Sequence, residues 1–208
     1  ASDANSDVRL QLAFTVGEIG GPQAAQALAT IAERDGDNPW IRTAILSSSA
    51  EIADQLLPRI SEHQSDLIRE LAKIVGSRGK LDEMQRVIAS TKSAWGDVAI
   101  GLGEGLKRSG KNLRAIPWDP ASSQRIDALL AQAKESAITA NASNEVRLAG
   151  IRLLAFDDFE RVREPLSALL NSKLPLEIQS AAVAAISRFN RPERSEEHTS
   201  ELQSRFGI

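Results

Sequence analysis

The run with the strongest suggestion of chemistry is Gly105–Lys111, whose sequence GLKRSGK fits the first seven positions of a phosphate-binding P-loop. In a P-loop, backbone amides and the lysine hold the phosphates, and an eighth residue, Ser or Thr, binds magnesium. Asn112 occupies that eighth position, and the residues before Gly105 are typical of a helix rather than of the strand that a P-loop follows. A partial dinucleotide-binding pattern at Gly101, Gly103 and Gly105 also lacks a supporting sheet. We therefore expect these glycines to let a neighbouring helix approach closely, and we predict no nucleotide site.

Nucleophilic and metal-binding side chains are scarce. The chain has no cysteine, which excludes disulfides, thiolate metal sites and covalent haem attachment in this segment. His63 is the only histidine outside residues 194–208, and its polar neighbours place it at the surface. The acidic pair Asp157–Asp158 and the acids of Glu33–Asp37 lack the spacing of a calcium-binding loop, and Asp158 is better placed to begin a helix. We predict no catalytic, cofactor-binding or metal-binding residue, and no enzyme activity for this segment by itself.

The three tryptophans are candidate anchors for a partner, since buried aromatic anchors carry much of the energy of protein interfaces. Trp118 lies in the run Pro117–Pro120, which predicts an irregular loop, and is the best candidate for an exposed anchor. Trp40, in the first turn of a predicted helix, is expected to pack on the preceding repeat. Trp95 stands where a helix cap is expected.

A short pattern recurs six times and predicts the elements that position these residues. The pattern is a side chain that can accept hydrogen bonds at the start of a helix, followed three positions later by a branched apolar residue. The branched residues, 27 to 48 residues apart, are Val8, Ile41, Ile68, Val98, Val146 and Ile178. Such a side chain stands three positions upstream in four copies, at Asn5, Asn38, Ser65 and Ser143, whereas Pro175 fills this place in the sixth copy and Trp95 departs from the pattern in the fourth. Because repeats of this length are typical of helical arrays, the pattern indicates a repeat protein.

In four of the six copies the branched residue is followed by arginine, at Arg9, Arg42, Arg69 and Arg147. One arginine per repeat should form a structural ladder along the array. We expect each to pair with an acid in the first turn of a helix, where a negative charge favours the helix dipole. These acids are Asp7, Asp66, Asp97, Glu145 and Glu177. A row of anion-binding arginines is the less favoured alternative.

Apolar residues recur at helical spacing along most of the chain, and no segment alternates long enough to predict a strand. The first stripe is Val8, Leu12, Val16 and Ile19, and a later stripe beginning at Val146 is expected to pair with the helix that follows it. The predicted fold is all-α: an α-solenoid of about five to six HEAT-like helical hairpins over residues 1–193, with an irregular loop near 112–123.

The composition excludes two classes of protein. The net charge is −3, whereas non-specific binding to nucleic acid needs clustered Lys and Arg. No apolar run approaches the roughly 20 residues of a membrane-spanning helix. We therefore predict no nucleic-acid partner and no membrane span in this segment.

Residues 194–208 resemble the translation of a sequencing-library adapter, beginning with the eleven residues RSEEHTSELQS. We expect this tail to be artefactual, so that His198 and Phe206 carry no functional meaning. The chain also begins at Ala1 without Met, and we expect it to be a fragment of a longer protein.

The cap, branched residue and arginine, followed by a small-residue helix, resemble HEAT repeats over residues 5–190. Asp7–Glu18, Asn38–Ser48 and Leu176–Ile186 further resemble the HEAT segment of large predicted membrane-bound dehydrogenases of planctomycete-type bacteria. That resemblance implies an N-terminal β-propeller, HEAT repeats and a c-type cytochrome domain, of which only the repeats are present here.

The resemblance implies a non-catalytic scaffold or spacer, without a cofactor of its own, inside a multidomain exported oxidoreductase. The neighbouring domains would be its partners, and its location periplasmic or exported. The alternative is a stand-alone HEAT adaptor that binds a protein partner.

Overall fold

The computed structural model describes residues 1–189, and these residues form α-helices and short 3-10 helices with no strand. The all-α prediction is therefore confirmed for the described residues. The predicted artefactual tail, 194–208, lies outside them. The α-helices are α1 (Ser6–Thr15), α2 (Gly21–Asp35), α3 (Pro39–Ser47), α4 (Ala53–Leu56), α5 (Ser65–Arg78), α6 (Leu81–Ser90), α7 (Trp95–Leu106), α8 (Pro120–Ile138), α9 (Asn144–Leu154), α10 (Phe159–Ala168) and α11 (Leu176–Ser187). The 3-10 helices are η1 (Val16–Glu18), η2 (Leu57–Arg59), η3 (Lys107–Ser109) and η4 (Leu113–Ala115).

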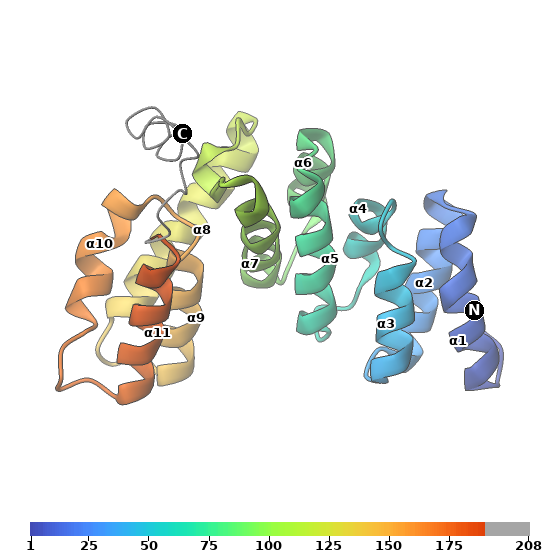
Figure 1. Ribbon diagram of the computed structural model, residues 1–208, viewed down its shortest axis with the longest axis horizontal. Helices are drawn as coiled ribbons and strands as arrows, with labels where there is room; N and C mark the ends of the chain where they lie inside the picture. The colour runs from blue at the N-terminus through green and yellow to red at the C-terminus, as the bar shows by residue number, and fades with distance from the viewer. Residues whose placement is uncertain (190–208) are drawn as a thin grey trace, which may run out of the picture.

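The helices form two rows. Each odd-numbered helix from α1 to α11 packs against the next odd-numbered one, and the even-numbered helices do the same in a second row behind them (Figure 1). The chain alternates between the rows, so the odd-numbered helices all run in the same direction. The array is elongated, with α1 at one end and α10 and α11 at the other (Figure 1).

The predicted helix caps are largely confirmed. Asn5, Asn38 and Ser143 each accept a hydrogen bond from a backbone amide at the start of α1, α3 or α9. The prediction for Ser65 is wrong, because Ser65 is the first residue of α5 and Gln64 precedes it. The Gln64 side chain gives no cap and instead donates to the Ala32 carbonyl at 2.6 Å, which ties the start of α5 to α2.

The register of the repeated pattern differs between copies. The branched residue is buried in four copies, at Ile41, Ile68, Val98 and Ile178, as predicted. Val8 and Val146 are both 47% exposed, and the arginines that follow them, Arg9 and Arg147, are only 4% and 5% exposed. The predicted first stripe is therefore wrong in part: α1 buries Arg9 and Ala13, with Val16 beyond it, while Ile19 is exposed. In both helices the inward-facing arginine donates hydrogen bonds, Arg9 to Asp35, Asp3 and Ala4, and Arg147 to the Ala137 carbonyl.

The predicted irregular loop ends earlier than expected. Asp119 accepts a hydrogen bond from the Ser122 amide and Pro120 occupies the first helical position, so α8 begins at Pro120. The segment between α7 and α8 contains η3 and η4 and is held by Arg114, which binds Asp127 and Asp157.

The predicted pairing of the helix after Ser143 with its successor is also wrong. α9 packs mainly on α8 and α11 rather than on α10. Gly150 explains the choice, because a Cβ at this position would lie only 3.0 Å from the Ala137 amide nitrogen of α8. The absence of a side chain at Gly150 allows the backbones of α8 and α9 to touch.

Candidate functional site

The closest helix contact in the molecule joins α5 and α7. Three glycines produce it: Gly76 on α5 and Gly101 and Gly105 on α7. A Cβ on Gly101 would overlap the Arg69 carbonyl oxygen, and one on Gly105 would overlap the backbone of Lys73 and Ser77. This glycine seam confirms the prediction that the glycines allow close approach. Gly105 therefore lies inside a packed helix, which is incompatible with a phosphate-binding loop.

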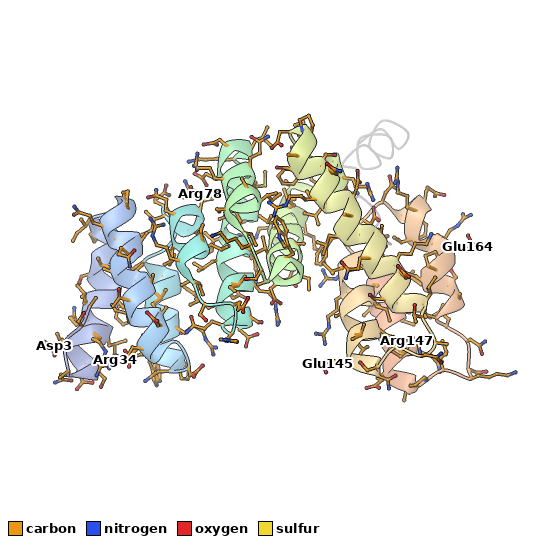
Figure 2. The ribbon with its side chains drawn as sticks, turned by 180° about the vertical axis from the view of Figure 1, so that it is seen from behind. Asp3, Arg34, Arg78, Glu145, Arg147 and Glu164 are labelled. Atoms are coloured by element: carbon orange, nitrogen blue, oxygen red, sulfur yellow. The ribbon has the colours of Figure 1, made fainter. Side chains whose placement is uncertain are left out.

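A groove of about 880 Å³ lies beside the glycine seam, along the odd-numbered row. Its lining comes from α5, α7, α9 and α11, including the turns that follow α9 and α11. Because these four helices run in the same direction, their N-terminal ends lie at one end of the groove and their C-terminal ends at the other. Glu145, in the first turn of α9, marks the N-terminal ends of these helices and lies at the lower edge of the molecule in Figure 2.

Four alanines of the groove lining, Ala149, Ala181, Ala184 and Ala185, come from α9 and α11, and a fifth, Ala155, directly follows α9. Phe156 contributes the one aromatic ring among the groove-lining residues. This ring packs against Gly103 of α7, and the Arg188 guanidinium lies over it at 4.8 Å from the ring centroid. Small side chains on two parallel helices leave room for a third chain segment to approach closely.

Charged side chains surround the alanines. Five carboxylates and three arginines line the groove. Arg69 pairs with Asp97 at 2.7 Å and with Asp66 at 3.3 Å, and the Arg188–Glu104 separation is 3.6 Å. The remaining charged lining residues are Glu70, Glu145 and Arg152.

Several of these groups are open to further interactions. Glu70 has only a 3.4 Å contact with Lys73, and Glu145 and Arg152 are exposed with no ion pair among residues 1–189. The Nη1 atom of Arg188 is buried and lacks a hydrogen-bond partner in the described part of the chain. The groove therefore presents unsatisfied charged groups beside an alanine surface.

The four arginines of the predicted ladder have four different environments. Arg69 matches the prediction, since it bonds to Asp97, a first-turn acid of the next helix in its row. Arg147 donates to the Ala137 carbonyl of α8 at 3.2 Å instead of pairing with an acid. Arg42 is partly exposed, and its side chain makes no hydrogen bond or ion pair within residues 1–189. A uniform ladder is absent from this part of the chain because only the α5–α7 step brings the next acid within reach.

Arg9 makes the most complete interaction of the four. Its Nε and Nη2 atoms donate to the two carboxylate oxygens of Asp35 at 2.6 Å each, and Nη1 donates to the carbonyls of Asp3 and Ala4. The hydrogen bonds from Arg9 lower the pKa of Asp35 below its ordinary value, and those bonds likewise raise the pKa of Arg9. Arg9 therefore fastens α1 to the end of α2 rather than to a neighbouring repeat.

The environments of Trp118 and Trp40 differ from the predicted ones. Trp118, predicted as an exposed anchor, is partly buried against the core, and its Nε1 atom donates to the Leu113 carbonyl at 2.6 Å. Trp40, predicted to pack on the preceding repeat, is 74% exposed. Trp95 begins α7 and stacks under Arg125, whose guanidinium carbon is 4.3 Å from the ring centroid. The Trp118 side chain thus holds the segment between α7 and α8 together, and no tryptophan is among the residues that line the groove.

Comparisons with known proteins give no further guidance. No protein-family model, no curated protein and no solved structure matches the chain. Residues 1–189 contain no grouping of three or more His, Cys, Asp or Glu side chains placed to hold a metal ion. Within the same residues, no helix is both long and apolar enough to cross a bilayer.

The groove itself was not predicted from sequence. The sequence pattern identifies the acids at the N-terminal ends of the lining helices only as first-turn acids of separate helices, and it identifies the alanines only as small residues of those helices. One signal could have indicated the groove: Ala149 and Ala184 are exposed alanines on repeat helices whose first turns carry Glu145 and Glu177.

Proposed function

We propose that this chain is a non-catalytic helical-repeat scaffold of HEAT-like hairpins that holds a segment of a protein partner in the groove between the glycine seam and α9 and α11. The observation that carries the proposal is the groove itself, which is open along four parallel helices and combines an alanine surface with charged walls. Repeat arrays commonly use such extended surfaces to bind partners.

A protein segment fits the groove better than the other ligand classes. Small-molecule sites are usually lined by apolar and aromatic side chains, whereas charged residues and alanines dominate here. Nucleic acid is disfavoured because five carboxylates would face its phosphates. A peptide can satisfy both the alanine surface and the charged walls.

The partner segment belongs, in this proposal, to a neighbouring domain of a larger exported oxidoreductase with a c-type cytochrome domain. The resemblance of Asp7–Glu18 and Asn38–Ser48 to the HEAT segment of such proteins supports this placement. A stand-alone adaptor would use the same groove for a separate protein.

The proposal is tested by selecting binding peptides from a random displayed library with the whole chain as bait. Each selected peptide is then titrated against Ala184→Trp, which fills the groove with an indole, and against Val183→Trp. Val183 is the matched control, because it is the adjacent residue of α11, is 56% exposed and does not line the groove.

We expect Ala184→Trp to weaken binding by at least about tenfold and Val183→Trp to leave it within about twofold. Equal binding to both variants, or a selection that enriches no peptide, would contradict the proposed function. Thermal melting of both variants checks that they are folded.

A further inference from the structure

The charge of the groove changes along its length. At the N-terminal end of the four helices, Asp66, Asp97 and Glu145 face a single arginine, Arg69. Toward the C-terminal end, two arginines, Arg152 in the last turn of α9 and Arg188 at the cap of α11, lie with Glu104. The fifth acid of the lining, Glu70, lies one turn beyond Asp66 in α5, between the two ends. The groove is therefore negative at one end and positive at the other.

Three charged side chains at the two ends of the groove have hydrogen-bonding capacity that residues 1–189 leave unused. Glu145, at the negative end, is exposed and has no ion pair within residues 1–189, whereas its counterpart Asp97 is already bound to Arg69. At the positive end, Arg152 is exposed and unpaired in the same residues, and Arg188 has a buried Nη1 atom without an acceptor. Each end thus has at least one charge left for a ligand.

An α-helix carries a matching polarity of its own. Its N-terminus bears a partial positive charge and favours Asp and Glu, and its C-terminus bears a partial negative charge and favours Lys and Arg. A helix that lies antiparallel to α7 and α9 would place its basic C-terminal turn beside Asp97 and Glu145. Its acidic N-terminal turn would then lie beside Arg152 and Arg188. A parallel helix would put like charges together at both ends.

The small side chains of the groove also suit a helix. A helix with its side chains is about 10–12 Å across, and interaxial distances shrink when the contacting residues are small. Ala149, Ala181 and Ala184 offer such a contact surface on two helices, next to the ring of Phe156.

We infer that the groove binds an amphipathic α-helix, antiparallel to α7 and α9, with acidic residues in its first turn, Lys or Arg in its last turn, and apolar residues on the face between them. This inference rests on the proposed function and adds the conformation, direction and charge order of the partner segment. Glu145 binds the basic end, and Arg152 and Arg188 bind the acidic end.

The test uses three synthetic peptides of about 14 residues, long enough for partial helix formation. The matched peptide has an Ala and Leu face at helical spacing, two Glu in its first turn and two Lys in its last turn. The reversed peptide exchanges the Glu and Lys positions, and the third is the matched peptide with a central Pro. Their dissociation constants are measured by fluorescence anisotropy against the wild-type chain at low and high salt.

We expect the matched peptide to bind about tenfold more tightly than the reversed one, with the difference shrinking at high salt, and the Pro peptide not to bind. Glu145→Gln should reduce this tenfold preference to about threefold. Glu164→Gln removes the same charge from an exposed position on α10, outside the groove lining and away from Glu145 in Figure 2, and should leave the preference unchanged.

The failure of this inference is distinguishable from failure of the proposed function. Equal affinity for the matched and reversed peptides, or tight binding of the Pro peptide, overturns the antiparallel helix. Absence of binding by the matched peptide at millimolar concentration overturns it as well. The proposed function stands or falls separately on the library selection and on the contrast between Ala184→Trp and Val183→Trp.

Discussion

Two neighbouring steps of the odd-numbered row differ in how their helices meet. Between α5 and α7 the backbones touch, because Gly76, Gly101 and Gly105 present no side chains to hold them apart. Between α7 and α9 the contact is slight, and the groove opens on the side where α9 and α11 present alanines and charged residues. The same row therefore contains a closed step and an open step.

The difference shows how side-chain size at a few positions can shape the packing of a row of helices. At the α5–α7 step, glycines allow the two backbones to touch, whereas at the α7–α9 step the ring of Phe156, just beyond the end of α9, packs against Gly103 of α7. In the proposed function, the closed step forms one wall of the groove and the open step provides the surface that contacts the partner segment. The predictions below test this contrast in order of decreasing effect.

We expect the largest effect on stability from substituting a glycine of the α5–α7 seam. Gly101→Ala places a Cβ onto the backbone oxygen of Arg69, which cannot move without moving α5. We expect a loss of about 2–4 kcal/mol in the free energy of unfolding, measured by urea denaturation, even though alanine is the better helix former. The matched control is Gly96→Ala in the same helix, where the nearest heavy atom, on Leu153, is 3.9 Å away and stability should change by less than about 0.5 kcal/mol. Equal stability of the two variants would show that the seam is not tightly packed.

The second effect concerns two arginines, one with many hydrogen bonds from its side chain and one with none in residues 1–189. Arg9→Ala removes the side-chain donors to the Asp35 carboxylate and the Ala4 carbonyl, and leaves the Asp3 carbonyl with Arg34 as its side-chain donor. We therefore expect the melting temperature to fall by about 5–10 °C. Arg42→Ala removes a side chain with no polar partner in residues 1–189, and its melting temperature should stay within about 2 °C of wild type. Similar losses in both variants would revive a uniform arginine ladder.

The third effect is a dependence of stability on pH. The pKa of Asp35 is lowered in the folded chain, so its pairing with Arg9 contributes fully above the ordinary value of 3.8 and is lost as the pH falls through the lowered folded value. Asp35→Asn should therefore be less stable than wild type at pH 7, and the gap should narrow below about pH 4. Thermal melts from pH 7 to pH 3 measure the gap. A gap that stays constant over this range would argue against a charged Asp35 in the folded state.

The smallest effect contrasts two tryptophans. Trp118→Phe removes the hydrogen bond to the Leu113 carbonyl and should cost about 1 kcal/mol of unfolding free energy. Trp40→Phe changes an exposed ring and should cost less than about 0.5 kcal/mol. Chemical denaturation of both variants provides the measurement. A larger loss at Trp40 would indicate that its ring packs on other residues.

The features of the fold that depend on neighbouring residues were predictable from sequence. Asn5, Asn38 and Ser143 cap their helices because the acceptor and its amides are two or three positions apart, and the all-α class follows from local spacing. The role of the glycines at 101 and 105 was also predictable, since glycine on a helix commonly marks close packing.

The features that depend on distant residues were not predictable. Val8 and Arg9 are adjacent, and which of them faces the core depends on Asp35, in another helix. The burial of Trp118 depends on the Leu113 carbonyl and on the way Arg114 holds the loop. The groove depends on the spacing between α7 and α9, which no local pattern encodes.

The most direct test of the central claim is site-specific cross-linking of a selected peptide to the open step. Because the chain has no cysteine, single cysteines that carry a benzophenone can replace Glu70, at the edge of the groove, or Glu164, on α10 and outside the groove lining. We expect the peptide to cross-link from position 70 and not from position 164, and we expect Ala184→Trp to abolish the cross-link. Cross-linking from position 164 alone, or from position 70 in the Ala184→Trp background, would contradict the central claim.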